Sequence, residues 1–87
     1  MFYIAVYDVG QKRVAKMLKL MRQYMAHVQN SVFEGELTKA QVAELRHKAK
    51  VLMNPEEDSL ILYAIRNAKW VDKVVLGVEK RQTDQFL

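Results

Sequence analysis

Val28 to Glu36 reads Val-Gln-Asn-Ser-Val-Phe-Glu-Gly-Glu, and this stretch decides the fold. The residues at both ends favour an extended strand, whereas the Asn30-Ser31 pair in the middle is typical of turns. We therefore predict a tight turn or bulge at Asn30-Ser31 that separates two short antiparallel strands within Ala26 to Leu37.

The chain before this stretch predicts one strand and one helix. Phe2 to Val9 is rich in aromatic and β-branched residues, and its even members Ile4, Val6 and Asp8 would share one face of a strand. Lys12 to Met25 has apolar residues at the spacing of a helix with one buried stripe. That stripe contains Val14, Met17, Leu18, Met21, Tyr24 and Met25.

The chain after this stretch predicts a second helix and two more strands. Thr38 and Gln41 form a capping-box signature at the start of the helix. Asn54-Pro55 ends it, because proline disfavours helical geometry in the residue before it. The buried stripe of this helix contains Val42, Leu45, Ala49 and Leu52. The remaining elements are a strand at Ser59 to Ile65, a short helical turn at Asn67 to Val71 and a last strand at Lys73 to Val78.

This order predicts an α+β fold, a ferredoxin-like βαββαβ sandwich with an additional C-terminal strand. The apolar runs Phe2 to Tyr7 and Leu60 to Ile65 imply apolar residues on both faces of the sheet, while the helices cover only one. We therefore expect a homodimer packed through the sheets, with Lys73 to Val78 added to the partner's sheet edge.

Length and composition fit one small cytoplasmic domain. The 87 residues contain no cysteine, so neither a disulfide nor a thiolate metal site can form. We assign residues 1–79 to the domain and residues 80–87 to a polar C-terminal tail. No apolar run is longer than seven residues, and the N-terminus lacks an export signal, so we expect a cytoplasmic protein without membrane partners.

The net charge of +4 is distributed unevenly, because no acidic residue occurs between Val9 and Phe33. A stretch of one sign attracts phosphates, and we predict that its first basic residues contact a nucleic-acid backbone without choosing bases. These residues are Lys12, Arg13, Lys16 and Lys19. A solvated helix face explains the same pattern equally well. Membrane binding is disfavoured, because the helix needs its apolar face for the core.

Common catalytic motifs are missing from the sequence. It has no Gly-rich phosphate loop, no H-E-x-x-H, no zinc spacing and no G-x-S-x-G. His27 and His47 are better read as packing or surface residues than as catalytic bases. Phe33 is predicted to pack in the core, and Ser31 to support the turn through backbone hydrogen bonds.

Asp8 closes a largely apolar strand, where aspartate commonly serves as a helix N-cap or a turn former. A second hypothesis follows if two chains pack sheet to sheet. Two Asp8 carboxylates would then face each other, and like charges so close must share a proton or bind a cation. Mg²⁺ suits one or two carboxylates with waters and phosphate oxygens, so we name Asp8 as the candidate catalytic residue and metal ligand.

Several motifs together resemble the family of CRISPR-associated protein 2. The likeness spans nearly the whole chain and is carried by Tyr7-Asp8-Val9, Lys12-Arg13-Val14, Val28 to Gly35, Asp58-Ser59-Leu60 with Tyr63, and Gly77. The resemblance implies a ferredoxin-fold homodimer that bridges two dimers of the integrase, CRISPR-associated protein 1, and holds duplex prespacer DNA. It also implies magnesium-dependent endonuclease activity on DNA or single-stranded RNA.

By the same resemblance Asp8 is the metal ligand, and Tyr7, Arg13 and Phe33 lie at positions linked to activity. At position 27 the sequence departs from the family's pattern, since many members carry arginine where this chain has His27. An alternative is a toxin-like ribonuclease of the virulence-associated protein D type, which shares the fold and has no part in spacer integration.

Overall fold

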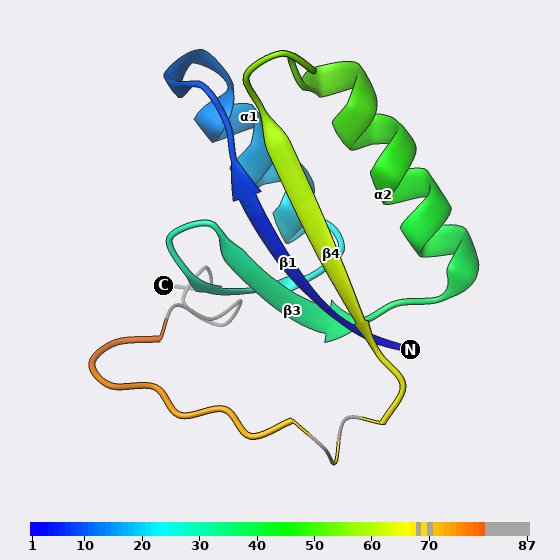
Figure 1. Cartoon of the computed structure of the whole chain (residues 1–87), viewed down its shortest axis with the longest axis vertical. Helices are drawn as coiled ribbons and strands as arrows, with labels where there is room; N and C mark the ends of the chain where they lie inside the picture. The colour runs from blue at the N-terminus through cyan, green and yellow to red at the C-terminus, as the bar shows by residue number, and fades with distance from the viewer. Residues whose placement is uncertain (68, 70, 80–87) are drawn as a thin grey trace.

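The computed structural model describes residues 1–67, 69 and 71–79 of the chain. The described residues form a four-stranded antiparallel sheet in the order β2-β3-β1-β4, and two helices cover one of its faces (Figure 1). The α+β fold with βαββαβ order is therefore confirmed. In chain order the elements are β1 (Phe2–Asp8), α1 (Gln11–Arg22), β2 (Ala26–Gln29), β3 (Val32–Glu36), α2 (Lys39–Leu52) and β4 (Ser59–Ile65).

The predicted turn at Asn30-Ser31 is confirmed. Asn30 has φ of 44°, a left-handed conformation that asparagine tolerates better than most residues. The register between β2 and β3 shifts between His27 and Gln29, which places a bulge beside the turn. The imidazole of His27 donates from Nε2 to the carbonyl oxygen of Asn30 over 2.6 Å and so holds the turn closed.

Helix α1 is shorter at its C-terminal end than the sequence predicts. It ends at Arg22, and the amides of Tyr24 and Met25 both donate to the carbonyl of Met21. This tight last turn brings Met25 into the core, where it is 3% exposed, directly before β2 begins. The predicted stripe also needs correction, because Val14 is 42% exposed whereas Leu20 is buried.

Helix α2 begins and ends where the sequence predicts. The Thr38 hydroxyl accepts from the Gln41 amide at 3.1 Å, and the Gln41 side-chain oxygen accepts from the Thr38 amide at 2.9 Å. This reciprocal capping box satisfies two backbone donors that a helix start leaves free. Met53 is the C-cap and already has an extended conformation, as expected just before Asn54-Pro55.

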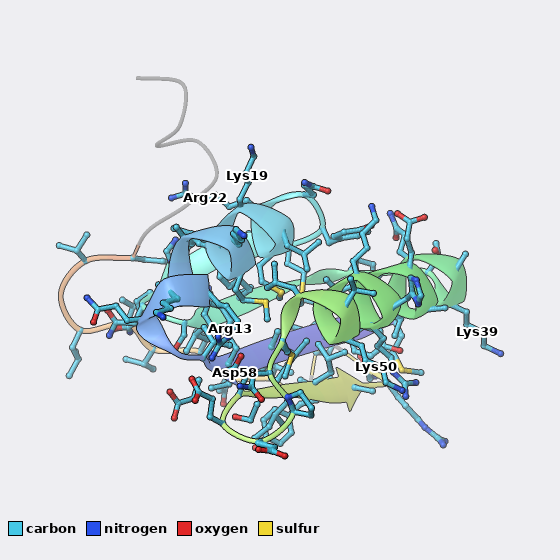
Figure 2. All side chains as sticks on the ribbon, turned by 90° about the horizontal axis from the view of Figure 1, so that it is seen from above. Arg13, Lys19, Arg22, Lys39, Lys50 and Asp58 are labelled. Carbon is cyan, nitrogen blue, oxygen red and sulfur yellow. The ribbon has the colours of Figure 1, made fainter. Side chains whose placement is uncertain are left out.

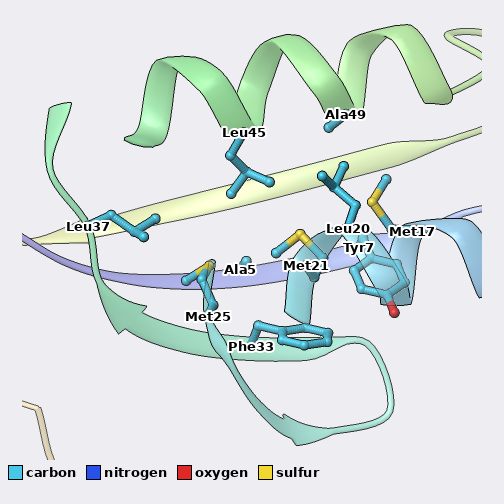
Figure 3. Packing of buried hydrophobic residues seen from close by; sticks show 10 residues of the cluster. All are labelled: Ala5, Tyr7, Met17, Leu20, Met21, Met25, Phe33, Leu37, Leu45 and Ala49. Atoms are coloured by element: carbon cyan, nitrogen blue, oxygen red, sulfur yellow. The ribbon is translucent and has the colours of Figure 1, made fainter. Parts of the chain in front are cut away.

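The core lies between the sheet and the two helices (Figure 3). Phe33 is fully buried in this core, which confirms its predicted role in packing. The largest fully buried side chains that the helices contribute to the core are Met17, Met21 and Leu45. Methionine fills irregular gaps well, which suits a core where two helices meet a short hairpin.

The opposite face of the sheet carries apolar side chains that the described part of the chain leaves partly exposed. Side chains alternate between the faces of a strand, so Ile4 and Val6 point away from the buried Ala5 and Tyr7. On the neighbouring strand Ile61 pairs with Val6 and Tyr63 pairs with Ile4 on this same face. Ile61 is 47% and Tyr63 55% exposed, so this face, called the open face below, is apolar and accessible.

The strand predicted at Lys73 to Val78 is not formed in the single chain. Residues 71–79 pair with no other strand in the described part of the structure, and Val74, Leu76 and Val78 are each at least 79% exposed. The Lys73 ammonium instead binds Glu34 of the interior strand β3 at 2.7 Å. Strand β3 is interior and its edges are already paired, and the pairing of Lys73 to Val78 with a partner's sheet edge stays a prediction.

Two further predictions concern residues that lie wholly or partly outside the part of the chain that the structure describes. Residues 68 and 70 of the helical turn predicted at Asn67 to Val71 are not among the described residues, nor is the predicted tail at 80–87. Within the described part of the chain, no helix has both the length and the apolar character needed to cross a membrane.

Candidate functional site

Asp8 lies at the end of β1 with its side chain exposed. Because it alternates with the buried Tyr7, its carboxylate is on the side of the sheet that carries Ile4 and Val6. A shallow hollow of about 300 Å³ opens here, lined by Tyr7, Asp8, Val9, Val14, Asn30 and Ser31. The amide of Tyr7 donates to the Ser31 carbonyl at 3.1 Å, which ties the β2–β3 turn to the strand that carries Asp8.

An aromatic stack forms the buried wall behind this hollow. The rings of Tyr7 and Phe33 stack with centroids 6.0 Å apart, and the imidazole of His27 lies parallel to Phe33 at 4.4 Å. Burial raises the pKa of the Tyr7 phenol above its usual range, with the charge of Arg22 acting in the opposite direction. His27 is only 5% exposed and Phe33 is fully buried, so these three side chains support the hollow from behind.

A buried carboxylate holds the loop that follows Asp8. Asp58 accepts from the amides of Gly10 at 2.7 Å and Asn54 at 2.8 Å. It also accepts two hydrogen bonds from the Arg13 guanidinium, one from Nε and one from Nη2, the latter at 3.0 Å. Figure 2 shows Arg13 and Asp58 facing each other where the start of α1 meets the loop before β4.

Asp58, Glu57 and Arg13 form a group that we call the Asp58 cluster. Its two carboxylates compensate for the missing side-chain cap at the start of α1. Helix α1 begins after Gly10, has no side-chain cap and has no acidic residue in its first turn. Asp58 and Glu57 supply anionic groups from the α2–β4 loop, and carboxylates stabilise the positive end of a helix. A Cβ at Gly10 would meet the ends of the Glu57 and Arg13 side chains, which would have to shift to make room for it.

The same contacts shift the ionisation of both partners. Hydrogen bonds from Arg13 hold the pKa of Asp58 well below its usual range, and the amides of Asn54 and Gly10 act in the same direction against the effect of burial. The pKa of Arg13 is raised, chiefly by its hydrogen bond to Asp58. Arg13 is thus already neutralised by two carboxylates, which sets it apart from the other predicted phosphate ligands.

The three lysines predicted to contact phosphates form an exposed stripe on α1. Lys12, Lys16 and Lys19 are all exposed, and their spacing of four and three residues places them on one side of the helix. We call them the lysine stripe. Figure 2 shows Lys19 and Arg22 on one side of the helical layer and Lys39 and Lys50 on the other. The stripe begins four residues after Asp8 in the chain.

One chain supplies only part of a metal site. No group of three or more acidic, histidine or cysteine side chains gathers within the described residues, and Asp8 is the only carboxylate that lines the hollow. Mg²⁺ accepts one or two carboxylates when waters and phosphate oxygens complete its shell. A single Asp8 therefore gives Mg²⁺ the minimum of one carboxylate, and a second Asp8 from another chain would supply the other.

The structure brings Tyr7, Asp8 and Ser31 together and places Phe33 and His27 behind them, while His47 lies apart on α2. Sequence reasoning missed Asp58 and Glu57. The strand pairing explains their place: Asp8 is opposite Ser59, which puts the acidic loop before β4 beside the loop after β1.

Comparison with known proteins gives one consistent family. The model of the family described as CRISPR associated protein Cas2 matches residues 1–73. The CRISPR-associated endoribonuclease Cas2 of Dictyoglomus turgidum is 42% identical over 87 residues, covering all of both chains. The protein of the same name from Thermotoga maritima is 45% identical over 87 residues, covering all of this chain and 99% of its own length.

Solved structures agree with this relationship. A crystal structure described as cas2 superposes with a TM-score of 0.82 at 42% identity and covers 92% of this chain and 90% of its own. The crystal structure of Streptococcus pyogenes Cas2 at pH 6.5 superposes with a TM-score of 0.74 at 29% identity, covering 86% of this chain and 100% of its own.

The Asp58 cluster makes folding stability depend on pH. A carboxyl group whose pKa is lowered by folding contributes stability above its unfolded pKa of about 4 and loses that contribution as the pH falls toward the folded pKa. We expect Asp58→Asn to lower the free energy of unfolding most at neutral pH, with the difference from wild type shrinking below about pH 4. Urea unfolding between pH 3 and pH 7 measures this.

The control is Glu56→Gln, which removes a carboxylate from the same loop. The side chain of Glu56 is exposed, and its backbone amide, which the substitution keeps, donates to the Asn54 side chain. The free energy of unfolding should therefore stay within about 0.5 kcal/mol of wild type at every pH. A destabilisation by Asp58→Asn that does not vary with pH would contradict an ionic role for this carboxylate.

Proposed function

The chain belongs to the CRISPR-associated protein Cas2 family. From this premise we propose that it is a CRISPR-associated nuclease whose homodimer binds duplex prespacer DNA. In this proposal the dimer bridges dimers of the CRISPR-associated protein 1 integrase during spacer acquisition. Magnesium-dependent endonuclease activity, on DNA or single-stranded RNA, is a second activity of the same dimer. The family relationship also favours this function over a toxin-like ribonuclease.

The observation that carries the proposal is the lysine stripe. Lys12, Lys16 and Lys19 are exposed on one side of α1, and the chain has no acidic residue from Val9 to Phe33 to offset them. Side chains of this kind bind the phosphate backbone through charge, which suits a protein that must hold many different DNA sequences. Arg13 has the separate role of fixing the start of α1 through Asp58.

The open face supports a homodimer. Ile4, Val6, Ile61 and Tyr63 lie on it, and large apolar side chains gathered on one sheet face favour burial against a second surface. A second copy is the simplest surface that matches itself. Two copies packed through this face would each present a lysine stripe on the helical side, so the dimer would offer two phosphate-binding surfaces.

Asp8 would gain its partner in the same dimer. Its carboxylate is on the side of the sheet that the second copy covers, so two Asp8 residues approach each other from the two chains. Bound Mg²⁺ would acidify a water molecule for attack on a phosphodiester. The protein's own part is to present the two carboxylates, to hold their loops through Asp58, and to keep the substrate backbone near them through the lysine stripe.

Neutralising the lysine stripe should change the salt dependence of binding. Removing one phosphate contact with duplex DNA lowers the slope of log K against log salt by about 0.9, so Lys12→Ala/Lys16→Ala/Lys19→Ala should reduce it by about 2 to 3 per chain. Fluorescence anisotropy with labelled duplex DNA at several salt concentrations measures the slope. The control Lys39→Ala/Lys50→Ala alters the other side of the helical layer and should leave most of the slope intact. Equal slopes for wild type and the stripe variant would refute this surface.

A charge on the open face should separate the two copies. Ile61→Asp puts a carboxylate into the proposed contact, where it would be desolvated without a partner. We expect a dimer for wild type and a monomer for the variant in size-exclusion chromatography with light scattering. The control Val51→Asp alters an apolar residue on α2 that is 74% exposed and should remain dimeric. A wild-type monomer at all concentrations would remove the basis of the paired Asp8 site.

Asp8→Asn should abolish magnesium-dependent cleavage and leave DNA binding nearly unchanged. The substitution removes the charged ligand but keeps the shape of the side chain, so the lysine stripe is unaffected. Cleavage of labelled RNA and duplex DNA is measured with and without Mg²⁺, and binding by anisotropy. Asp72→Asn is the control, an exposed aspartate outside the hollow. Full cleavage by Asp8→Asn after rigorous purification would show that the activity has another origin.

A further inference from the structure

Residues 71–79 contact their own chain, although they pair with no strand in the described part of it. After β4 ends at Ile65, the chain turns back toward the β3 side of the sheet (Figure 1). There the Lys73 ammonium donates to both carboxylate oxygens of Glu34, at 2.7 and 2.9 Å. It also forms an ion pair with the Glu79 carboxylate at 2.6 Å. We call Lys73, Glu34 and Glu79 together the latch.

The latch occupies part of the open face. Glu34 follows the fully buried Phe33 along β3, so its carboxylate lies on the opposite side of the sheet from the core. Its register partner on β1 is Ile4, which belongs to the open face. The side chains of Glu34 and Glu79 are only 13% and 17% exposed, so water and salt screen this ion pair less than a fully exposed one. A second copy that packs through the open face must therefore displace the latch.

The segment does not have the geometry of a strand while the latch is closed. Gly77 has φ of 96°, whereas residues in strands have φ of about −120° to −140°. A Cβ at Gly77 would meet no atom of the described residues within 4 Å, so the backbone conformation, and not packing, calls for glycine here. Pairing of residues 73–78 with a partner's sheet edge therefore requires a change of φ at Gly77 as well as release of Lys73.

The closed segment leaves large apolar side chains in water. Val74, Leu76 and Val78 are 82%, 90% and 79% exposed. Burial of such side chains against a second chain is favourable, but association costs translational and rotational freedom that a contact within one chain does not lose. Rising protein concentration therefore shifts the balance from the closed latch toward pairing between chains.

We propose that the latch is an autoinhibitory contact that holds the single chain in a state unable to dimerise. Its opening clears the open face and releases residues 73–78 to pair with the sheet edge of a second copy. This inference rests on the proposed homodimer and adds that each chain must open before it assembles. The apparent dissociation constant of the dimer then includes the open fraction of both chains, so a change that opens the latch tightens the dimer.

Zero-length cross-linking tests whether the latch closes within one chain. A carbodiimide joins an amine to a carboxylate with which it is in direct contact, as Lys73 is with Glu34. The full chain is prepared with and without a heavy-nitrogen label, and the two preparations are mixed in equal amounts at low concentration. We expect the Glu34–Lys73 cross-link only in peptides of uniform label. Peptides of mixed label would show that the contact forms between chains and would overturn the proposal.

Lys48 and Glu44 provide the positive control for this chemistry. They lie four residues apart on α2, and their Nζ and Oε1 atoms are 3.4 Å apart. Their cross-link should appear with uniform label in the same digest. Cross-linking of this pair without any Glu34–Lys73 product would show that the latch is open in solution, which contradicts the proposal.

Lys73→Gln should strengthen the dimer, because it removes the charge that binds both carboxylates. We expect a dimer dissociation constant at least about fivefold lower than that of wild type, measured by analytical ultracentrifugation. The matched control is Lys69→Gln. Lys69 is exposed on the same connection, and its backbone amide, which the substitution keeps, donates to the Asn67 side chain. The control should dimerise as wild type does, and an unchanged or higher dissociation constant for Lys73→Gln would refute a latch that opposes assembly.

Gly77→Ala tests the same equilibrium through the backbone. Alanine disfavours φ of 96° but is compatible with a strand, so the substitution should destabilise the closed state and leave the paired state intact. We expect a dimer at least about fivefold tighter, together with a weaker Glu34–Lys73 cross-link. A weaker dimer with an unchanged cross-link would assign the bend at Gly77 to the dimer and would overturn the proposal.

These measurements separate the latch from the proposed function. If wild type and Lys73→Gln dimerise equally well and bind duplex DNA as dimers, the latch is refuted and the proposed function stands. If neither wild type nor an opened variant dimerises at any concentration, the latch and the proposed homodimer are refuted together. DNA binding by the lysine stripe is measured independently of both by the salt dependence described above.

Discussion

The buried carboxylate of Asp58 joins the two loops that position the candidate site. It accepts hydrogen bonds from Gly10, Asn54 and Arg13, so it fixes the end of β1, the start of α1 and the end of α2 at one point. A buried charge is stable only when hydrogen bonds replace the water it has lost, and here four donors do so. The direction of Asp8 and the position of the lysine stripe both depend on this junction.

The second constraint is that the helices cover only one face of the sheet. The buried side chains of β1, Ala5 and Tyr7, lie against the helices, and the alternation of the strand then assigns Ile4, Val6 and Asp8 to the open face. One strand thus carries core residues, apolar surface and the candidate metal-binding carboxylate in a fixed order. A slip of one residue in its register would exchange all three, which is why the hairpin and its bulge matter for the site.

Much of this arrangement could be predicted from local signals. The polar pair Asn30-Ser31 identified the turn, Thr38 with Gln41 identified the start of α2, and Asn54-Pro55 its end. The end of α1 could not be predicted, because no glycine or proline marks it and the packing of Met25 decides it. Arg13 was predicted to contact a nucleic-acid backbone, and its ion pair could not be predicted because its partner Asp58 is 45 positions away, beyond the reach of any periodic pattern. The fate of Lys73 to Val78 depends on tertiary contacts in the same way.

The two proposed activities place different demands on this fold. Phosphate binding by the lysine stripe acts through charge at several ångströms, so it tolerates small changes in how two copies pack. Hydrolysis depends on two Asp8 side chains meeting across the dimer, and a displacement of about 1 Å is enough to reduce such chemistry strongly. A single chain already has the stripe but only half of the carboxylate pair. Of the two proposed activities, DNA binding would therefore be the less sensitive to dimer geometry, and cleavage would be the one that a small change in that geometry can add or remove.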